Sequence, residues 1–196
     1  MTQPALPKGQ KRLRSRAAII AAATEVVARR GIMAATLDEI AKRAGMTKGA
    51  IYSNFASKDD LVLAVLDARQ MTFVPDLASG ASAEALLQGM GRALLARLDE
   101  IRADGRFIAE LQFYAVQSPE LGRRLADRYS QSFTMIADQI VMHYGGTLPM
   151  PPRSLVVAVQ CLALGFIYQA LMTPDEVDEA AVMGAFTALA RGLSRP

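Results

Sequence analysis

The sequence predicts an all-α fold of about nine helices, and three observations support that prediction. Apolar residues recur three or four positions apart along most of the 196-residue chain, which is the period of an amphipathic helix. No segment shows the strict apolar–polar alternation that is typical of a half-buried strand. Ser and Thr caps, together with glycine and proline, mark the ends of several of the periodic segments.

A first helix is expected over residues 14–32, followed by a second, shorter one. The apolar face of the first is formed by Ile19, Ala22, Ala23, Val26 and Val27. Thr36 can cap the second helix, and Glu39, three residues later, completes a capping box. Gly45 follows where the chain must adopt a left-handed backbone, a conformation that glycine reaches at little cost. These residues predict a short helix that ends in a tight turn.

The helix expected after this turn is short, polar and basic at its start. Thr47 can cap it, Lys48 supplies charge, and the small residues after Lys48 let the backbone approach base edges closely. Ile51 and Phe55, four residues apart, are expected to face inward. The outward positions carry groups suited to phosphate and base contacts, namely Tyr52, Ser53 and Asn54. The pattern predicts a helix-turn-helix that inserts its second helix into the major groove of DNA, although a helical hairpin with solvated charges is the alternative.

This region resembles the TetR family of one-component transcriptional regulators. The resemblance rests on residues 14–32, 36–41, 45–55 and 58–61, within an N-terminal match that covers about a quarter of the chain. One departure is Asn54, which stands where many members carry His. The motif and the resemblance together place the following residues at the DNA: Arg14, Thr36, Thr47, Lys48, Gly49, Ala50, Tyr52, Ser53, Asn54 and Lys58.

Charge is spread unevenly along the chain, whose formal net charge is +3. Residues 1–58 carry eleven Lys and Arg against three Asp and Glu, whereas residues 59–196 carry eleven against sixteen. The basic part is the one expected to face a polyanion. We therefore expect a flexible tail over 1–10, a DNA-binding domain over 11–58 and a ligand-binding and dimerisation domain over 59–196. The basic residues near the tail either reach a DNA groove or form a solvated arm, and both alternatives stay open.

The helical period continues beyond residue 61 in six further segments. The expected ranges are 61–73 before Pro75, 82–103, 106–117, 118–144 with Ser118 as cap, the uncharged run 154–174, and 173–193. The uncharged run is long enough to span a bilayer. Its two glutamines, Gln160 and Gln169, and the lack of a strong flanking positive cluster favour a protein core or a subunit interface instead.

Enzyme chemistry is not expected from this sequence. The chain holds one histidine, His143, and has no nucleophile elbow and no glycine-rich phosphate loop. Its one cysteine, Cys161, excludes an intrachain disulfide and a multi-cysteine metal site, and is expected to be buried and inert. We expect no catalytic residue, cofactor or metal. Because no signal peptide is visible, we expect the protein in the cytoplasm.

For the second domain, the resemblance implies a small-molecule pocket and a dimer formed by the last two helices. The pocket candidates, each of which is equally suited to plain core, are Met90, Leu94, Phe107, Leu111, Gln112, Tyr114, Phe133, Gln139, His143 and Phe166. The dimer candidates are Ala158, Leu162, Gly165, Gln169, Phe186 and Leu189. The expected function is a repressor that binds a palindromic operator in double-stranded DNA as a homodimer and is released by a small-molecule effector, without a membrane partner. Activation, and a helical interaction or membrane-associated protein without DNA binding, are the alternatives.

Overall fold

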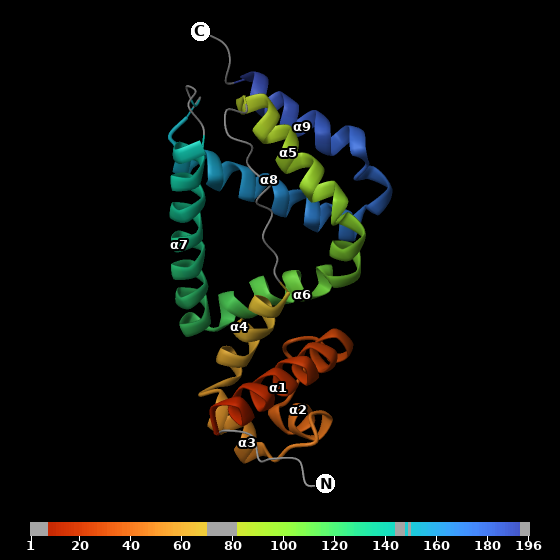
Figure 1. The fold of residues 1–196 in the computed structure, drawn as a ribbon. Helices are drawn as coiled ribbons and strands as arrows, with labels where there is room; N and C mark the ends of the chain where they lie inside the picture. The colour runs from red at the N-terminus through yellow and green to blue at the C-terminus, as the bar shows by residue number, and fades with distance from the viewer. Residues whose placement is uncertain (1–7, 70–81, 144–147, 149, 193–196) are drawn as a thin grey trace, which may run out of the picture. The chain divides into compact units, whose positions relative to one another are not determined.

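The computed structural model describes residues 8–69, 82–143, 148 and 150–192. Within these residues the fold is all-α, as predicted (Figure 1). The described helices are α1 (Lys8–Arg30), α2 (Leu37–Arg43), α3 (Lys48–Asn54), α4 (Lys58–Ala68), α5 (Ala83–Ala96), α6 (Leu98–Gln117), α7 (Pro119–His143), α8 (Pro152–Met172) and α9 (Glu179–Gly192), with a 3-10 turn, η1 (Pro174–Glu176), before α9.

Residue contacts divide the chain into two compact units. The N-terminal unit holds α1 to α4 together with the segment Glu110–Tyr114 of α6, and the C-terminal unit holds the other described residues from α5 to α9. This division differs from the expected boundary at residue 58. The reason is that α4 packs on α1 and therefore belongs with the N-terminal unit.

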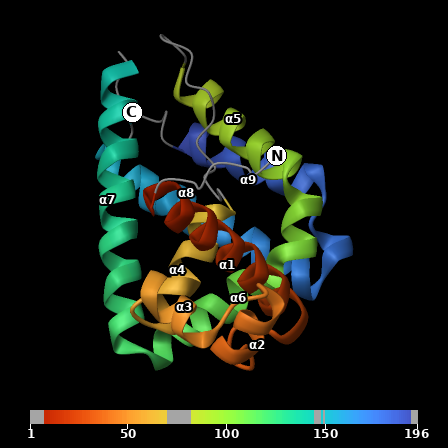
Figure 2. The ribbon, with the colours of Figure 1, turned by 60° about the horizontal axis from the view of Figure 1, so that its bottom comes forward.

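The core of the N-terminal unit lies between α1 and the three helices packed against it, α2, α3 and α4 (Figure 2). All five apolar residues predicted for the inner face of α1 are buried. The same core contains Ile40, Ile51 and Leu61, each at most 2% exposed. Burial of large aliphatic side chains stabilises such a core by roughly 1.5–3 kcal/mol each.

Side-chain caps begin α2 and α3, as predicted, and also α4. Each cap accepts a hydrogen bond from the backbone N–H three residues later, at 3.2 Å for Thr36, 3.2 Å for Thr47 and 3.1 Å for Ser57. The carboxylate of Glu39 does not follow the predicted capping box. It accepts from Arg30 Nε at 3.1 Å, so this side chain links α2 to the end of α1.

In the C-terminal unit α5 packs along α9, and α7 packs on α8 (Figure 1). Gly91 permits the close approach of α5 to α9, since a Cβ at this position would lie 3.1 Å from Met183 Sδ and 3.2 Å from the Phe186 ring. Phe186 is 1% exposed. Its predicted place at the dimer face is therefore corrected, because its own subunit encloses the ring.

Two helix ends in the N-terminal unit differ from the prediction. α1 begins at Lys8 and not at residue 14, so residues 8–10, expected in the flexible tail, are helical. Gln10, Lys11 and Arg12 near this start are good helix formers and are exposed. α4 ends at Ala68, before the predicted end at residue 73, and residues 70–73 lie outside the described part of the chain.

The predicted helix over 82–103 is divided in the structure, because α5 ends at Ala96 and α6 begins at Leu98. Gly105 stands close to the predicted break but lies inside α6. A Cβ at this position would overlap the side chain of Leu171. This glycine therefore allows close packing and does not mark a helix end.

The ninth helix begins later than predicted. Pro174 opens the 3-10 turn η1, and α9 starts only at Glu179. The carboxylate of Asp178 accepts from Ala181 N at 2.7 Å and acts as the cap.

Among the described helices, α8 alone is long and apolar enough to cross a membrane, with 28% of its most apolar window buried in the subunit. Length and composition are weak evidence for a span, since the helix of a subunit interface passes the same test. The start of α8 is fixed to α7, because Arg153 Nη2 donates to Ser130 Oγ at 2.9 Å.

Candidate nucleic-acid interface

The turn and short helix predicted to read DNA are both present in the N-terminal unit. Gly45 has a φ of +65°, in the left-handed region that favours glycine. Met46 N donates to Ala41 O at 2.9 Å and closes the turn. Ile51 and Phe55 are 0% and 2% exposed and anchor α3 in the core. The remaining side of α3 therefore faces outward.

The outward surface of α3 combines one charge, one phenol and several small groups. Its exposed residues are Thr47, Lys48, Gly49, Tyr52 and Ser53, with Ala50 half-buried beside them. Tyr52 keeps 53% of its surface exposed although it is aromatic. Small residues at 49 and 50 allow the backbone to come close to base edges, and the phenol and ammonium can contact phosphates or bases.

Arg16 of α1 binds the far end of α3, a role that is not predicted from the sequence. Its Nη1 donates to Asn54 O at 2.8 Å, and its guanidinium carbon lies 4.2 Å from the centroid of the Phe55 ring. A cation at the carboxyl end of a helix is favourable, and so is a guanidinium over an aromatic ring. Local spacing gives no signal for this contact, because 38 residues separate the partners.

The predicted outward position of Asn54 is wrong. The residue is half-buried, and its Nδ2 donates to Ala50 O at 2.8 Å. Ser53 Oγ donates to the same carbonyl at 2.9 Å but stays exposed. Short polar side chains commonly bond back to their own helix in this way. Asn54 therefore bonds to the backbone of α3 at the end of that helix.

Lys58 is also turned inward, in contrast to the predicted phosphate contact. Its Nζ donates to Met33 O at 3.2 Å and lies 5.6 Å from the centroid of the Tyr114 ring. Partial burial lowers the pKa of Lys58 below its ordinary value. Of the other predicted DNA residues, Arg14 is exposed on α1, and Thr36 is exposed while its hydroxyl caps α2.

Two side chains of α6 bond to the rest of the N-terminal unit. The carboxylate of Glu110 accepts from Ile32 N, directly after α1. Four residues further along, Tyr114 Oη donates to Asp59 Oδ1 at 2.7 Å. Burial, followed by this hydrogen bond, raises the pKa of Tyr114 to about 12. The hydroxyl of Tyr114, a predicted pocket candidate, is therefore bound to α4.

The other pocket candidates lie in the C-terminal unit, apart from Leu111 and Gln112 in the α6 segment of the N-terminal unit. Met90, Leu94, Phe107 and Leu111 are buried core residues, and Gln112, Phe133, Gln139 and Phe166 are half-buried. His143 ends α7, but its side chain lies outside the described set.

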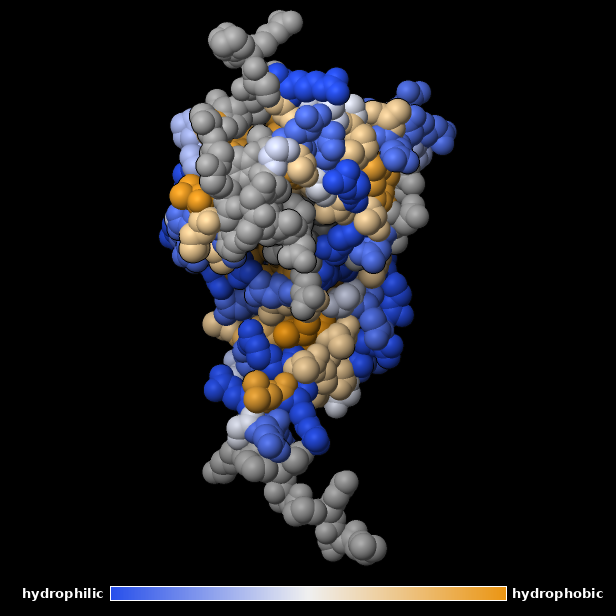
Figure 3. Space-filling model, turned by 45° about the horizontal axis from the view of Figure 1, so that its top comes forward, coloured by the Kyte–Doolittle hydropathy of each residue, from blue (hydrophilic) through white to orange (hydrophobic). Residues whose placement is uncertain are grey.

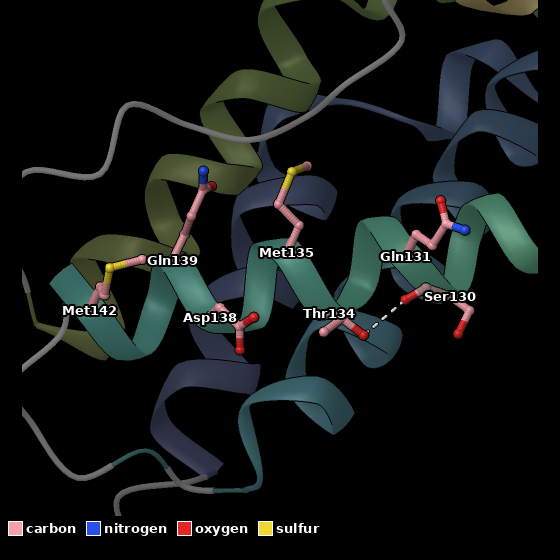
Figure 4. Close-up of a pocket in the computed structure, with 7 residues that line it drawn as sticks. All are labelled: Ser130, Gln131, Thr134, Met135, Asp138, Gln139 and Met142. Atoms are coloured by element: carbon pink, nitrogen blue, oxygen red, sulfur yellow. Dashed lines mark hydrogen bonds between the residues drawn. The ribbon is translucent and has the colours of Figure 1, made fainter.

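An open hollow of about 560 Å³ runs along α7 (Figure 4). It is lined by Ser130, Gln131, Thr134, Met135, Asp138, Gln139 and Met142. Met135 and Gln139 project to one side of the helix, and Thr134 and Asp138 to the other. The lining residues include Gln139, one of the predicted pocket candidates.

The dimer candidates on α8 lie on the less buried part of that helix. Gly165 and Gln169 are exposed, and Ala158 and Leu162 are half-buried, as is Leu189 on α9. Cys161 is exposed, in contrast to its predicted burial, because it falls on the same outward stripe four residues before Gly165. No group of metal-ligating side chains that could hold an ion occurs among the described residues.

The capped α3, its exposed basic and phenolic surface, and the all-α framework define a helix-turn-helix protein. A family model described as bacterial regulatory proteins, tetR family, matches residues 19–65. The HTH-type transcriptional regulator SrpR of Pseudomonas putida is 30% identical over 189 residues, covering 90% of this chain and 85% of the relative. An HTH-type transcriptional repressor of Mycobacterium tuberculosis is 30% identical over 152 residues, or 74% of this chain and 78% of its own length.

Solved structures share the fold. The multidrug binding protein EbrR, in its complex with imidazole, has a TM-score of 0.68 at 24% identity and covers 89% of this chain and 88% of that chain. The chain belongs to the TetR family of helix-turn-helix transcriptional regulators. It is therefore a DNA-binding regulator and not an enzyme.

Proposed function

We propose that the chain is a ligand-responsive repressor that binds a palindromic DNA operator as a homodimer in the cytoplasm. The observation that carries this proposal is the outward surface of α3, which exposes Lys48 and Tyr52 beside small residues on a capped, core-anchored helix. Within residues 1–58 basic residues outnumber acidic ones by eleven to three, which suits a polyanionic partner. The repressor among its relatives supports repression as the direction of control.

A dimer is supported by α8. This helix carries no charge from Ser154 to Met172, yet only 28% of its most apolar window is buried in the subunit. A second copy is the cover that we propose for the exposed stripe through Cys161, Gly165 and Gln169. A two-fold dimer would present two α3 helices to major grooves about 34–36 Å apart, so the operator is expected to be palindromic.

The proposed effector is a small molecule with a mainly apolar surface, bound in the C-terminal unit. The similar structure of EbrR, described as a multidrug binding protein, supports this class. α6 is the proposed link to DNA binding, because Glu110 and Tyr114 on this continuous helix bond to residues beside α1 and in α4. A coupling of about 1–3 kcal/mol between the two sites is sufficient.

The proposal is tested by selecting bound sites from random duplex DNA and then screening compounds for release. We expect a palindromic site to be enriched. Tyr52→Ala should weaken binding to all sequences, whereas Lys48→Ala or Ala50→Ser should change which sites are enriched. Sites without two-fold symmetry would contradict the dimer, and an absence of any enrichment would contradict sequence reading by α3.

A further inference from the structure

Lys48, the first residue of α3, already has an ionic partner. Its Nζ lies 2.9 Å from Asp38 Oδ2 and 2.9 Å from Asp38 Oδ1, so both oxygens of this carboxylate contact the ammonium. Asp38 stands in the first turn of α2. The hydrogen bond and the charge of Asp38 both raise the pKa of Lys48 above its ordinary value. Lys48 is therefore a cation whose position is set by a neighbouring helix.

The pair is not explained by stability. Both side chains are exposed, Lys48 at 52% and Asp38 at 66%, and exposed ion pairs contribute little to folding. A carboxylate beside the outward surface of α3 also repels phosphates. Two other acidic residues of this region, Glu25 and Glu39, pair instead with Arg43 and Arg30. Asp38 is thus distinguished by pairing with a residue of the proposed reading helix.

We infer that Asp38 is a specificity-determining residue, which holds Lys48 back from phosphates and leaves it for an acceptor on a base edge. This inference rests on the proposed function of α3. A free lysine is a flexible point charge that reaches any nearby phosphate. One N–H group of the ammonium is directed at the Asp38 carboxylate, so the ion pair restricts the position of Nζ and the directions of its two remaining donors. Such a group adds little to the affinity for random DNA. A correctly placed guanine acceptor accepts a directed hydrogen bond from it, which adds to the affinity for the operator.

The test compares Asp38→Asn with Glu25→Gln. Each substitution removes one exposed carboxylate from a pair in the N-terminal unit, and Glu25 lies 2.6 Å from Arg43 Nε on α2, away from Lys48. Affinity is measured for the selected operator and for random duplex DNA across a range of salt. We expect Asp38→Asn to tighten random-DNA binding about twofold to fivefold and to steepen its salt dependence by about one released counterion. The ratio of operator to random affinity should fall accordingly.

Glu25→Gln should raise the two affinities in proportion and leave their ratio unchanged. In the Lys48→Gln background, Asp38→Asn should no longer change the ratio of operator to random affinity, because the ammonium that Asp38 positions is absent. Asp38→Ser serves the same comparison if the Asn variant fails to fold. An unchanged ratio in Asp38→Asn, or an equal fall in Glu25→Gln, overturns the inference while wild-type operator binding still supports the proposed function. Failure of the wild-type chain to bind any DNA would overturn the proposed function itself.

Discussion

The two units of the molecule are stabilised in different ways. In the N-terminal unit, polar contacts join residues that are distant in sequence, such as Arg16 to the end of α3 and Tyr114 to Asp59. In the C-terminal unit, the contact between α5 and α9 depends on the fit of Phe186 against Gly91. The first arrangement fixes the direction of individual side chains, as reading DNA requires. The second arrangement fixes how the helices pack, but it uses residue types that do not mark a ligand site in the sequence.

Charge, and not the exposure of apolar side chains, distinguishes the surfaces of the two units. Figure 3 shows blue hydrophilic residues interspersed with orange and tan hydrophobic ones. Large apolar side chains remain exposed in both units, among them Leu13 and Met33 in the N-terminal unit and Met135, Met142 and Met172 in the C-terminal unit. Exposed apolar side chains of this kind can contact a partner or a ligand. The basic surface of the N-terminal unit instead suits a polyanion.

The largest expected effect is in the C-terminal unit. Phe186→Ala should lower the free energy of unfolding by about 3–5 kcal/mol, because the ring is enclosed between α5 and α9. Urea unfolding measures this change, with the half-buried Leu189→Ala as the milder control. If Phe186→Ala instead left stability intact and abolished only the dimer, the residue would belong at the subunit interface after all.

Two glycines of the N-terminal unit provide the next comparison. Gly31 and Gly45 both have positive φ, +83° and +65°, so alanine should cost about 1–2 kcal/mol at either. A Cβ at Gly31 would also overlap the carboxylate of Glu110, whereas nothing lies within 4 Å of one at Gly45. We therefore expect the larger loss of unfolding free energy for Gly31→Ala. Adding Glu110→Ala should recover part of it, and equal losses at the two glycines would argue against the Glu110 contact.

Helix caps sharpen the comparison further, because side-chain caps begin helices in both units. Thr47 caps α3 and Ser82 caps α5, where its Oγ accepts from Ala85 N at 3.1 Å. Alanine at either position should cost about 1 kcal/mol of unfolding free energy. Only Thr47→Ala should also weaken operator binding, as measured by fluorescence anisotropy. Similar binding by the two variants would mean that the start of α3 is not at the DNA.

An expected effect of similar size to the loss of a cap concerns the hydroxyl of Tyr114. Its pKa is raised to about 12, so the folded state favours the neutral phenol. The stabilisation is present below the ordinary tyrosine pKa of about 10 and is lost as pH rises through about 12. Tyr114→Phe should remove the latest tyrosinate transition in an absorbance titration and cost about 1 kcal/mol at neutral pH. Persistence of that transition in the variant would assign it to another tyrosine.

The reading helix could be predicted from the sequence because its signals are local. Thr36, Thr47 and Gly45 each specify a backbone conformation within a few residues, and the structure confirms all three. The inward turn of Lys58 and the role of Arg16 were missed because both depend on distant partners. Gly105 lies between two predicted helices but inside α6, where it admits Leu171, so a glycine in the sequence does not by itself mark a helix end. Pocket and core share the same apolar residue types, so sequence alone does not separate them.

The most direct test of the account is the affinity of the intact protein for its selected operator as a function of salt concentration. If the outward surface of α3 and the basic residues around it bind the phosphate backbone, the logarithm of the binding constant falls linearly with the logarithm of salt, by about 0.9 for each phosphate neutralised. The account predicts this steep dependence and a weaker binding constant for Tyr52→Ala at every salt concentration. Binding that is indifferent to salt, or unaffected by loss of the Tyr52 ring, would contradict the claim that this surface reads DNA.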